Sequence, residues 1–429
     1  MTIKVRLLHR LFAALVCLMY AIPFSLCAQG NMRIGVNIRN TGWGGAANCL
    51  SNGNWNATYL TEMGIYASVR FMEQQTTNET QGVVNWANRN MTAPFTYELS
   101  VDLCNRIDAD GWWNVPARAT DDYVRGLAQL LFSSLEPGRV AYIEYGNELW
   151  NTAPWFIANT SYAADKCTEL QLVSPEPARW EYKTAYYQMY RILQIQEIFR
   201  QVYGDALQQR ARFIAGSFVS DVWWTNHLIA AAKLDKVNPG KNTIDGFGVA
   251  PYFGGAGDAA ALPLKSHKGT IDANYNAHFK CSAKLVAYEG GQDNDPGFQQ
   301  NAASYEVYKT HFDFAARYMD LYCHYTEYGS GWGAKTVIGQ PDQQAPKYRA
   351  IRDWTQAHPY DPSLDASAAQ APGPRLHPVS SAGASGLLFD LTGRRYAPVY
   401  GQDLRPGDGR AARGVVLSVD GARTGLAAP

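Results

Sequence analysis

Eight short β-rich runs alternate with helical or loop-rich stretches along most of this 429-residue chain. The runs cover residues 32–39, 66–72, 111–117, 139–145, 211–218, 244–252, 284–288 and 323–328. They are continuous apolar or mixed runs, as expected for strands that are covered on both faces. Eight such repeats predict an α/β fold, a (β/α)8 TIM barrel, with an open α/β sheet as the alternative. No GxGxxG motif follows the first run and no GxxxxGK[ST] motif occurs, so the sequence does not support a dinucleotide-binding or P-loop fold.

Two of the intervening stretches carry clear helix signals. Thr120 and the two aspartates after it supply an N-cap and an acidic first turn, and the proline and glycine at 137–138 end that helix. A second helix is expected over residues 182–203, with Gly204 as its C-cap. Both helices fit the repeating strand-and-helix pattern of the barrel.

The first 28 residues have the pattern of a secretory signal peptide. Three basic residues precede the apolar run 11–22, and a plausible cleavage point follows Ala28. The apolar run is shorter than a stable membrane span requires. We therefore expect an exported protein, secreted or held at the cell surface, with a periplasmic location or an uncleaved anchor as alternatives.

The composition changes after the last predicted strand and helix. Residues 361–385 contain no aromatic residue and consist largely of Ala, Ser, Pro and Gly, which is typical of a flexible linker. The barrel domain is therefore predicted to span residues 29–360. Residues 386–429 contain two short β-like runs and resemble the C-terminal sorting tails of bacterial proteins exported by the type IX secretion route. That resemblance implies a contact with the secretion machinery, and a small β-module or a disordered tail is the alternative.

The balance of charged and aromatic residues narrows the class of ligand. Lys and Arg number 38, as do Asp and Glu, so the chain lacks the excess of basic residues with which proteins bind nucleic acid. Tyr and Trp, at 26 and 12, together outnumber the 16 Phe, which favours aromatic faces that also carry a polar group. Nine tryptophans fall in connections predicted to lie at the barrel mouth: Trp43, Trp55, Trp86, Trp150, Trp155, Trp180, Trp223, Trp224 and Trp332. We expect them to serve carbohydrate binding as a group.

The cysteines and histidines give no sign of a metal site. The five cysteines after residue 28 are widely and irregularly spaced, which leaves one or two disulfides open and at least one thiol free. The eight histidines show no HExxH or HxH spacing. No metal and no organic cofactor is expected.

Two glutamates directly follow predicted strands. The fourth run leads into Gly-Asn-Glu at 146–148, and the seventh leads into Glu289. Because the strands of a (β/α)8 barrel present reactive side chains at their carboxyl ends, the two carboxyl groups are predicted to meet at the barrel mouth.

These motifs resemble those of the retaining glycoside hydrolases of clan A. The segment IEYGNELWN at 143–151 is similar to the motif that carries the acid/base glutamate after an asparagine, and VAYEGG at 286–291 is similar to the motif of the nucleophile. Arg70 in SVRF and Trp332 in SGWG match two further positions. The resemblance covers residues 32–350 and implies cleavage of a polysaccharide or oligosaccharide by double displacement.

Double displacement needs one carboxylate that attacks as an anion and one carboxylic acid that protonates the leaving oxygen. The resemblance implies that Glu289 is the nucleophile and Glu148 the acid/base residue. It also implies that Asn147 binds the sugar 2-hydroxyl and that Arg70 holds Glu289 as an anion. The further candidate substrate-binding residues are Tyr252, Trp332, Asn37, Trp43 and Trp150.

Several alternatives stay open at this point. Glu327 is the rival nucleophile, because the eighth strand is poorly defined. Glu144, within the fourth strand, is expected to be a buried structural partner for Arg70. For the whole chain, the alternatives are a carbohydrate-binding barrel without catalysis and a polysaccharide lyase.

Overall fold

A computed structural model describes residues 31–39, 49–51, 53–75, 77–78, 82–92, 96–173, 179–254 and 258–361, and the backbone of three short strands further on. The predicted signal peptide, nearly all of the predicted linker and Trp43 lie outside the described residues. The three short strands, β13 (Leu388–Phe389), β14 (Arg395–Ala397) and β15 (Leu417–Ser418), fall within the predicted tail and pair antiparallel.

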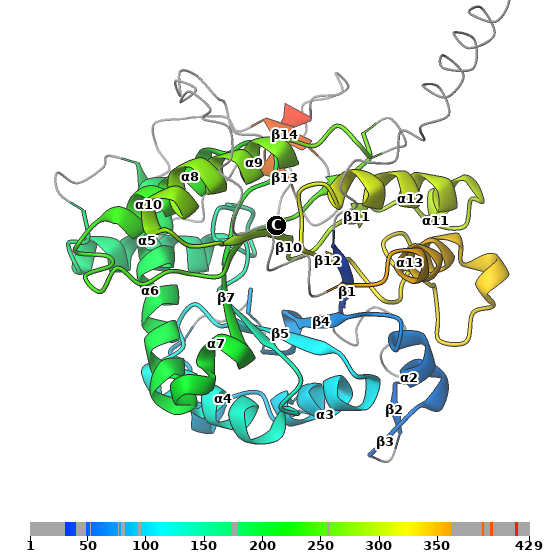
Figure 1. Ribbon diagram of the computed structural model, residues 1–429, viewed down its shortest axis with the longest axis horizontal. Helices are drawn as coiled ribbons and strands as arrows, with labels where there is room; N and C mark the ends of the chain where they lie inside the picture. Colours follow the sequence, from blue (N-terminus) through cyan, green and yellow to red (C-terminus); the bar gives the residue numbers. More distant parts are fainter. Residues whose placement is uncertain are drawn as a thin grey trace, which may run out of the picture.

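Eight parallel strands form a closed barrel in the order β1-β12-β10-β8-β7-β6-β5-β4 (Figure 1). Their bounds are β1 (Arg33–Asn37), β4 (Ser68–Phe71), β5 (Asp110–Val115), β6 (Ala141–Tyr145), β7 (Ala211–Gly216), β8 (Gly246–Val249), β10 (Lys284–Ala287) and β12 (Leu321–His324). The first strand closes the barrel by pairing with both β12 and β4. The predicted (β/α)8 TIM barrel is thereby confirmed, and the open sheet is excluded.

Helices surround the strands, and short elements occupy some of the connections (Figure 1). The α-helices are α2 (Ala57–Met63), α3 (Tyr97–Ile107), α4 (Asp121–Ser134), α5 (Ile157–Glu169), α6 (Trp180–Tyr203), α7 (Leu207–Arg210), α8 (Trp223–Lys233), α9 (Leu264–Thr270), α10 (Ala277–Phe279), α11 (Pro296–Gln299), α12 (Ala303–Ala315) and α13 (Pro346–Ala357). The short elements are β2 (Leu50–Ser51), β3 (Asn54–Trp55), β9 (Tyr252–Phe253), β11 (Gly291–Gln292), η3 (Glu73–Gln75), η4 (Trp86–Asn88), η5 (Gly204–Ala206), the π-helical η6 (Ile271–Asn276) and η7 (Asp342–Gln344).

The predicted ends of the two marked helices are confirmed. The Thr120 hydroxyl accepts a hydrogen bond from the backbone N–H of Tyr123 and so caps α4. Gly204 is the C-cap of α6, with a φ of 53° that a residue with a side chain adopts at a cost.

The sixth and eighth strands differ from their predicted bounds. β8 ends at Val249 rather than at residue 252, because Pro251 has no N–H to donate to a sheet. The next two residues form β9, which pairs with β11. β12 begins at Leu321 and ends at His324, whereas residues 323–328 were expected, because its pairing with β1 runs from Leu321 to His324.

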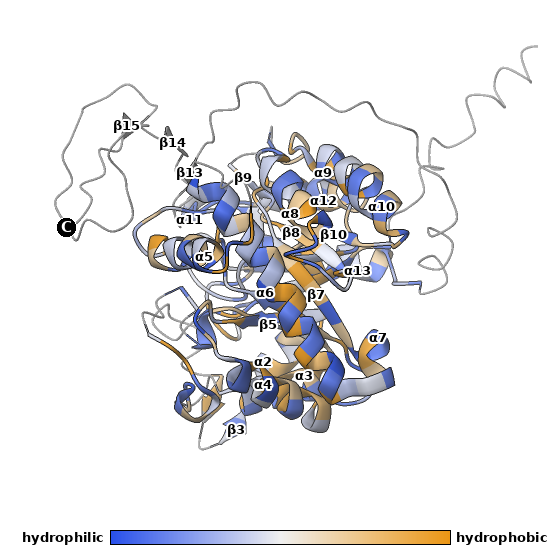
Figure 2. Ribbon diagram, turned by 90° about the vertical axis from the view of Figure 1, so that its left-hand side faces the viewer, coloured by the Kyte–Doolittle hydropathy of each residue, from blue (hydrophilic) through white to orange (hydrophobic). Residues whose placement is uncertain are grey.

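Apolar side chains fill the space between the strands and the helices, and a smaller group fills the barrel interior. The interior group consists of Trp112, Tyr142, Ile214, Ala250, Val286, Tyr288, Leu321 and Cys323. In Figure 2 the ribbon of β7 carries a strongly hydrophobic colouring, whereas that of the helices is mixed. The five cysteines among the described residues are free thiols, so no disulfide joins them.

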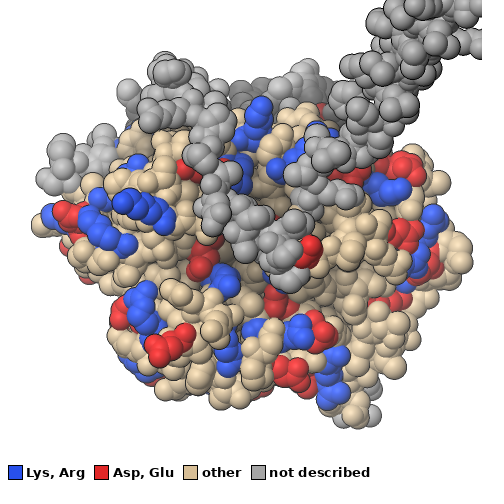
Figure 3. All heavy atoms as spheres, viewed as in Figure 1, with Lys and Arg blue, Asp and Glu red and all other residues tan. Residues whose placement is uncertain are grey.

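The exposed surface carries charges of both signs. On the face seen in Figure 3, the described Lys and Arg side chains are interspersed with Asp and Glu side chains in small mixed groups. Of the helices that the structure describes, none has the length and apolar character to cross a membrane.

Candidate active site

Arg70, in β4, is the polar centre of the barrel. Its side chain is fully buried and donates hydrogen bonds to the side chains of four residues from three other strand ends. It donates to Glu144 Oε2 at 2.8 and 3.1 Å, to Asn147 Oδ1 at 2.8 Å, to Asn37 Oδ1 at 3.0 Å and to Glu289 Oε2 at 3.3 Å. The expected contacts of Arg70 with Glu289 and with Glu144 are both present.

Glu148 lies in a tight turn directly after β6. Gly146 has a φ of 68° and Glu148 itself a φ of 46°. A positive φ at a residue with a side chain is strained, and such strain is found preferentially at functional sites. The Glu148 carboxyl group accepts hydrogen bonds from Asn151 Nδ2 at 2.9 Å and from the Tyr288 hydroxyl at 3.2 Å.

The carboxyl groups of Glu148 and Glu289 are close enough for each to affect the ionisation of the other. Burial raises the pKa of both groups, and repulsion from Glu148 raises the pKa of Glu289 further. Arg70 opposes that rise, since its ion pair is with Glu289. A close buried pair of this kind retains one proton between its two carboxyl groups. The contact with Arg70 favours the negative charge on Glu289 and the proton on Glu148.

Aromatic side chains border the carboxyl pair. The Tyr288 hydroxyl accepts a hydrogen bond from Trp150 Nε1 at 3.3 Å, and the Trp150 ring packs on Phe218 with 4.6 Å between ring centroids. Burial raises the pKa of Tyr252, and the charge of Glu289 raises it further, so the phenol lies in the same electrostatic environment as that carboxyl group. The structure therefore brings Trp150 and Tyr252 to the carboxyl pair.

A second aromatic group lies on the loop after β12. The Tyr325 ring is 6.2 Å from that of Tyr252 and 5.6 Å from that of Trp332. The Arg39 guanidinium lies over both the Tyr325 and the Trp332 rings, at 5.4 and 5.2 Å. Trp332 is thus linked through Tyr325 to Tyr252 by ring contacts.

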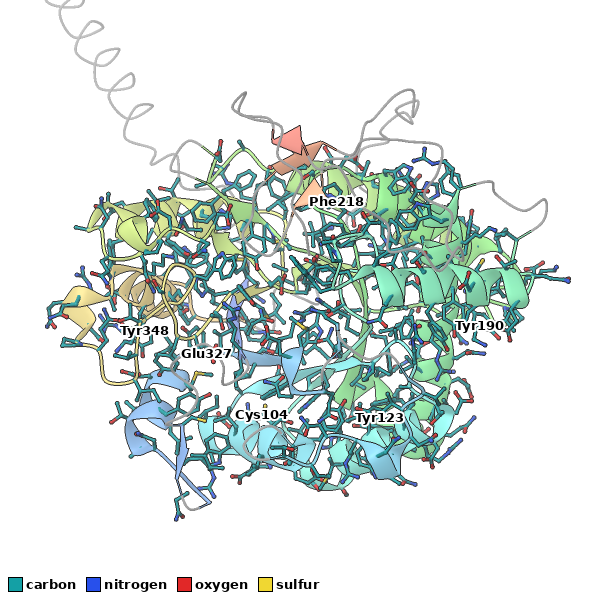
Figure 4. All side chains as sticks on the ribbon, turned by 180° about the vertical axis from the view of Figure 1, so that it is seen from behind. Cys104, Tyr123, Tyr190, Phe218, Glu327 and Tyr348 are labelled. Atoms are coloured by element: carbon teal, nitrogen blue, oxygen red, sulfur yellow. The ribbon has the colours of Figure 1, made fainter. Side chains whose placement is uncertain are left out.

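The rival glutamate, Glu327, has a different environment. Its carboxyl group accepts hydrogen bonds from the backbone N–H of Arg39, at 3.2 Å to each oxygen, and from the Thr326 hydroxyl. Burial raises the pKa of Glu327 to about 8. Burial and the charge of Glu327 together raise the pKa of Tyr59 in α2. Figure 4 shows Glu327 well separated from Phe218, the residue on which the Trp150 ring packs. No described hydrogen bond joins Glu327 to Glu148 or Glu289.

Three of the nine tryptophans expected at the barrel mouth have other partners, and the grouping of all nine stays a prediction because Trp43 lies outside the described residues. Trp55 donates a hydrogen bond to Asp102 of α3, Trp86 stacks on Tyr97, and Trp224 is fully buried. The packing of helices against one another accounts for these three side chains. Trp150 is connected with the carboxyl pair through Tyr288, and Trp332 is connected with Tyr252 through Tyr325.

Sequence reasoning missed three polar contributors to the site. Asn151 and Tyr288 are close in sequence to the two glutamates and could have been found from that spacing. Asn78 accepts a hydrogen bond from Asn147 Nδ2 at 3.1 Å, and its position carries no sequence signal because it lies in an irregular loop after β4. In the part of the chain that the structure describes, no three His, Cys, Asp or Glu side chains are placed to hold a metal ion.

No family model and no curated protein matches the chain. It is similar to a solved structure of a modular endo-β-1,4-mannanase from Cellulomonas fimi, with 14% identity and a TM-score of 0.43, over 78% of this chain and 71% of that one. A family 51 α-L-arabinofuranosidase from Bifidobacterium longum shares 10% identity with a TM-score of 0.45, over 75% and 73% of the two chains. A family 39 glycoside hydrolase from Bacteroides cellulosilyticus shares 12% identity with a TM-score of 0.41, over 76% and 64%.

Proposed function

We propose that this chain is a retaining glycoside hydrolase that cleaves O-glycosidic bonds of a polysaccharide or oligosaccharide. One observation carries the proposal: two buried carboxyl groups from the ends of β6 and β10 face each other, and only one of these two forms an ion pair with Arg70. That asymmetry is what double displacement requires, since one group must be an anion and the other an acid.

In the first step, Glu289 attacks the anomeric carbon and the glycosidic C–O bond breaks. Glu148 gives its proton to the departing oxygen, so a glycosyl ester of Glu289 and a free alcohol result. In the second step, Glu148 takes a proton from water, the water oxygen bonds to the anomeric carbon, and Glu289 leaves as a carboxylate. Two inversions restore the original anomeric configuration.

The amides beside the pair have separate roles in this proposal. Asn147 Oδ1 is bound by Arg70 and one Nδ2 hydrogen by Asn78, which leaves the other Nδ2 hydrogen for a sugar 2-hydroxyl. Asn37 uses its oxygen for Arg70 and its Nδ2 for the backbone carbonyl of Tyr288 at 2.9 Å. We therefore assign Asn37 to positioning Arg70.

The aromatic residues would form the faces of the sugar site. Tyr252, Trp150 and Trp332 present flat apolar surfaces with a polar group at one edge, which suits pyranose and furanose rings. A sugar-binding role for Trp43 stays a prediction.

The test of the nucleophile is chemical rescue. A panel of aryl glycosides and polysaccharides first identifies a substrate, and NMR of the product gives its anomeric configuration. Glu289→Gly should then be inactive, and azide should restore turnover by forming a glycosyl azide. Glu327→Gly serves as the matched control, in which azide should form no such product. Full activity of Glu289→Gly would refute the assignment.

The same panel separates the alternative functions. A carbohydrate-binding barrel without catalysis would bind a glycan and cleave none, and Glu148→Gln would leave its affinity unchanged. A polysaccharide lyase would release unsaturated sugars. An inverted product configuration would exclude the retaining mechanism.

We also propose that the chain is exported after cleavage behind Ala28, and that residues 386–429 contact a secretion apparatus. The charged and apolar pattern of the first 28 residues supports the first part. Mass spectrometry of the protein from culture medium, periplasm and cells should find a mature chain that begins at Gln29. An intact N-terminus in every fraction would contradict it.

A further inference from the structure

Lys347 is the second residue of α13, and its ammonium group is completely buried. It donates hydrogen bonds to Gln292 Oε1 at 2.9 Å and to the backbone carbonyl of Gly331 at 2.6 Å, and it lies 5.6 Å from the centre of the Tyr308 ring. In Figure 1, α13 lies beside β1 and β12, near α11 and α12. The Lys347 side chain thus extends from α13 to the loops that follow β10 and β12.

This placement works against stability. The two hydrogen-bond acceptors are neutral oxygens. Burial lowers the pKa of Lys347 to about 7, although the charges of Asp295 and Asp293 act to raise it, and this lowering expresses the cost of desolvating the ammonium group. The N-terminal turn of a helix also disfavours a cation. In addition, Gln292 Nε2 is buried without a hydrogen-bond partner, because the amide is oriented with its oxygen toward Lys347. Polar contacts that lower stability in this way are found where function requires a fixed geometry.

Both loops that Lys347 holds carry residues of the candidate active site. Gln292 lies three residues after Glu289 and belongs to β11, whose partner β9 contains Tyr252, paired with Gly291. The backbone N–H of Gln292 is fixed as well, since it donates to the Tyr308 hydroxyl at 2.9 Å. Gly331 directly precedes Trp332. One ammonium group therefore fastens the segments of Glu289, Tyr252 and Trp332 to one another.

We propose that Lys347 is a positioning residue, which locks the loops after β10 and β12 so that Glu289 meets the anomeric carbon at the correct distance and angle. The role in turnover rests on the proposed function, whereas the locking of the two loops does not. A displacement of about 1 Å at a reacting group can lower a rate about 100-fold.

The test compares Lys347→Met with Lys335→Met. Lys335 is also buried, but it forms ion pairs with Glu62 at 2.7 Å and Asp342 at 2.8 Å, so it stabilises the fold. Lys347→Met should keep or raise the melting temperature, lower kcat about 10- to 100-fold and change KM little. Lys335→Met should lower the melting temperature and leave kcat of the folded enzyme unchanged.

Hydrogen exchange gives a readout that does not depend on activity. Amides of 289–293 and 329–333 should exchange faster in Lys347→Met than in the wild type, and Gln292→Leu should have the same effect. Unchanged exchange, or wild-type kcat in Lys347→Met, would overturn the proposal. So would unfolding of both Lys347→Met and Gln292→Leu, since the lysine would then serve stability. A wild type that cleaves no glycoside would refute the proposed function. The exchange comparison would then still test whether Lys347 locks the loops after β10 and β12.

Discussion

A single guanidinium group favours the charged form of the carboxyl groups inside this barrel, against the effect of their burial. Arg70 is held by Glu144 on one side and contacts Glu289 on the other. Trp112 also donates a hydrogen bond to Glu144, at 2.9 Å, which stabilises the carboxylate that anchors Arg70. Glu144 therefore orients Arg70, and Arg70 lowers the pKa of Glu289 against the rise that burial and Glu148 cause.

Replacing Arg70 by Met should lower the free energy of unfolding by about 3 to 5 kcal/mol, because two carboxylates would be left buried without a cation. Activity of the folded fraction should also fall. Denaturant titration measures the first effect. The control is Arg106→Ala, since Arg106 forms an exposed ion pair with Asp102 and its loss should cost about 1 kcal/mol or less. Equal losses in the two variants would contradict the central role of Arg70.

The protonation of Glu148 should be visible in the pH dependence of kcat/KM. Burial raises the pKa of Glu148, so the acid form persists to higher pH than in an ordinary glutamate, and activity should fall as pH rises through that raised pKa. Glu148→Ala should lose this alkaline fall on an aryl glycoside whose leaving group needs no proton. On an unactivated substrate its rate should drop about 100- to 10,000-fold. An alkaline fall that persists in the variant would assign it to another group.

Glu327 should make stability depend on pH. Its pKa is about 8 in the folded chain against an ordinary 4.5, so between these values the folded state holds a proton that the unfolded state has released. The free energy of unfolding therefore falls as pH rises from 4.5 to about 8, by on the order of 5 kcal/mol at most. Glu327→Gln should lack this contribution. Thermal unfolding of the wild type and of Glu327→Gln between pH 4.5 and 8 measures this contribution. The same pH dependence of stability in both proteins would contradict the prediction.

At the scale of elements, the strands with a plain apolar pattern were the predictable ones. Glu148 and Glu289 could be found because each comes directly after such a strand. The end of β12 could not be predicted in this way. Tyr325 and Tyr328 continue the β-like pattern of the sequence, whereas the pairing with β1 stops at His324. Contacts between distant elements, such as that of Asn78 with Asn147, depend on how the loops fold over the barrel.

The contact between η4 and α4 offers a test of packing between elements. Trp86 of η4 stacks on Tyr97 and covers Gly126 of α4, where an added Cβ would overlap the indole ring. Gly126→Ala should therefore lower the free energy of unfolding by about 1 to 3 kcal/mol, although alanine is the better helix former. Gly138 has open space around its Cβ position, so Gly138→Ala should be neutral or slightly stabilising. Thermal unfolding of both variants tests this prediction. A Gly126→Ala variant more stable than the wild type would show that the Trp86 ring moves away from the added methyl group.

At the scale of the whole molecule, the last helix completes the barrel before the predicted linker begins. α13 packs on α12, and its Ile351 and Trp354 are buried in the core. Beyond the helix, Tyr360 lies under the Arg33 guanidinium at 5.1 Å, and Asp361 exchanges two hydrogen bonds with Asn31 at 2.7 and 2.8 Å. These contacts fasten the end of the domain to its beginning.

A chain cut after Asp361 should therefore keep the melting temperature of the chain that runs from Gln29 to residue 429, together with any activity that the test of the proposed function finds. A chain cut after Ala345 should be unstable, because loss of α13 exposes the core that Ile351 and Trp354 cover and removes Lys347 from the loops of the active site. Scanning calorimetry and the aryl glycoside assay compare the three chains. If the cut after Asp361 lowers the melting temperature, residues beyond it contribute to the domain, and the boundary predicted from composition is wrong.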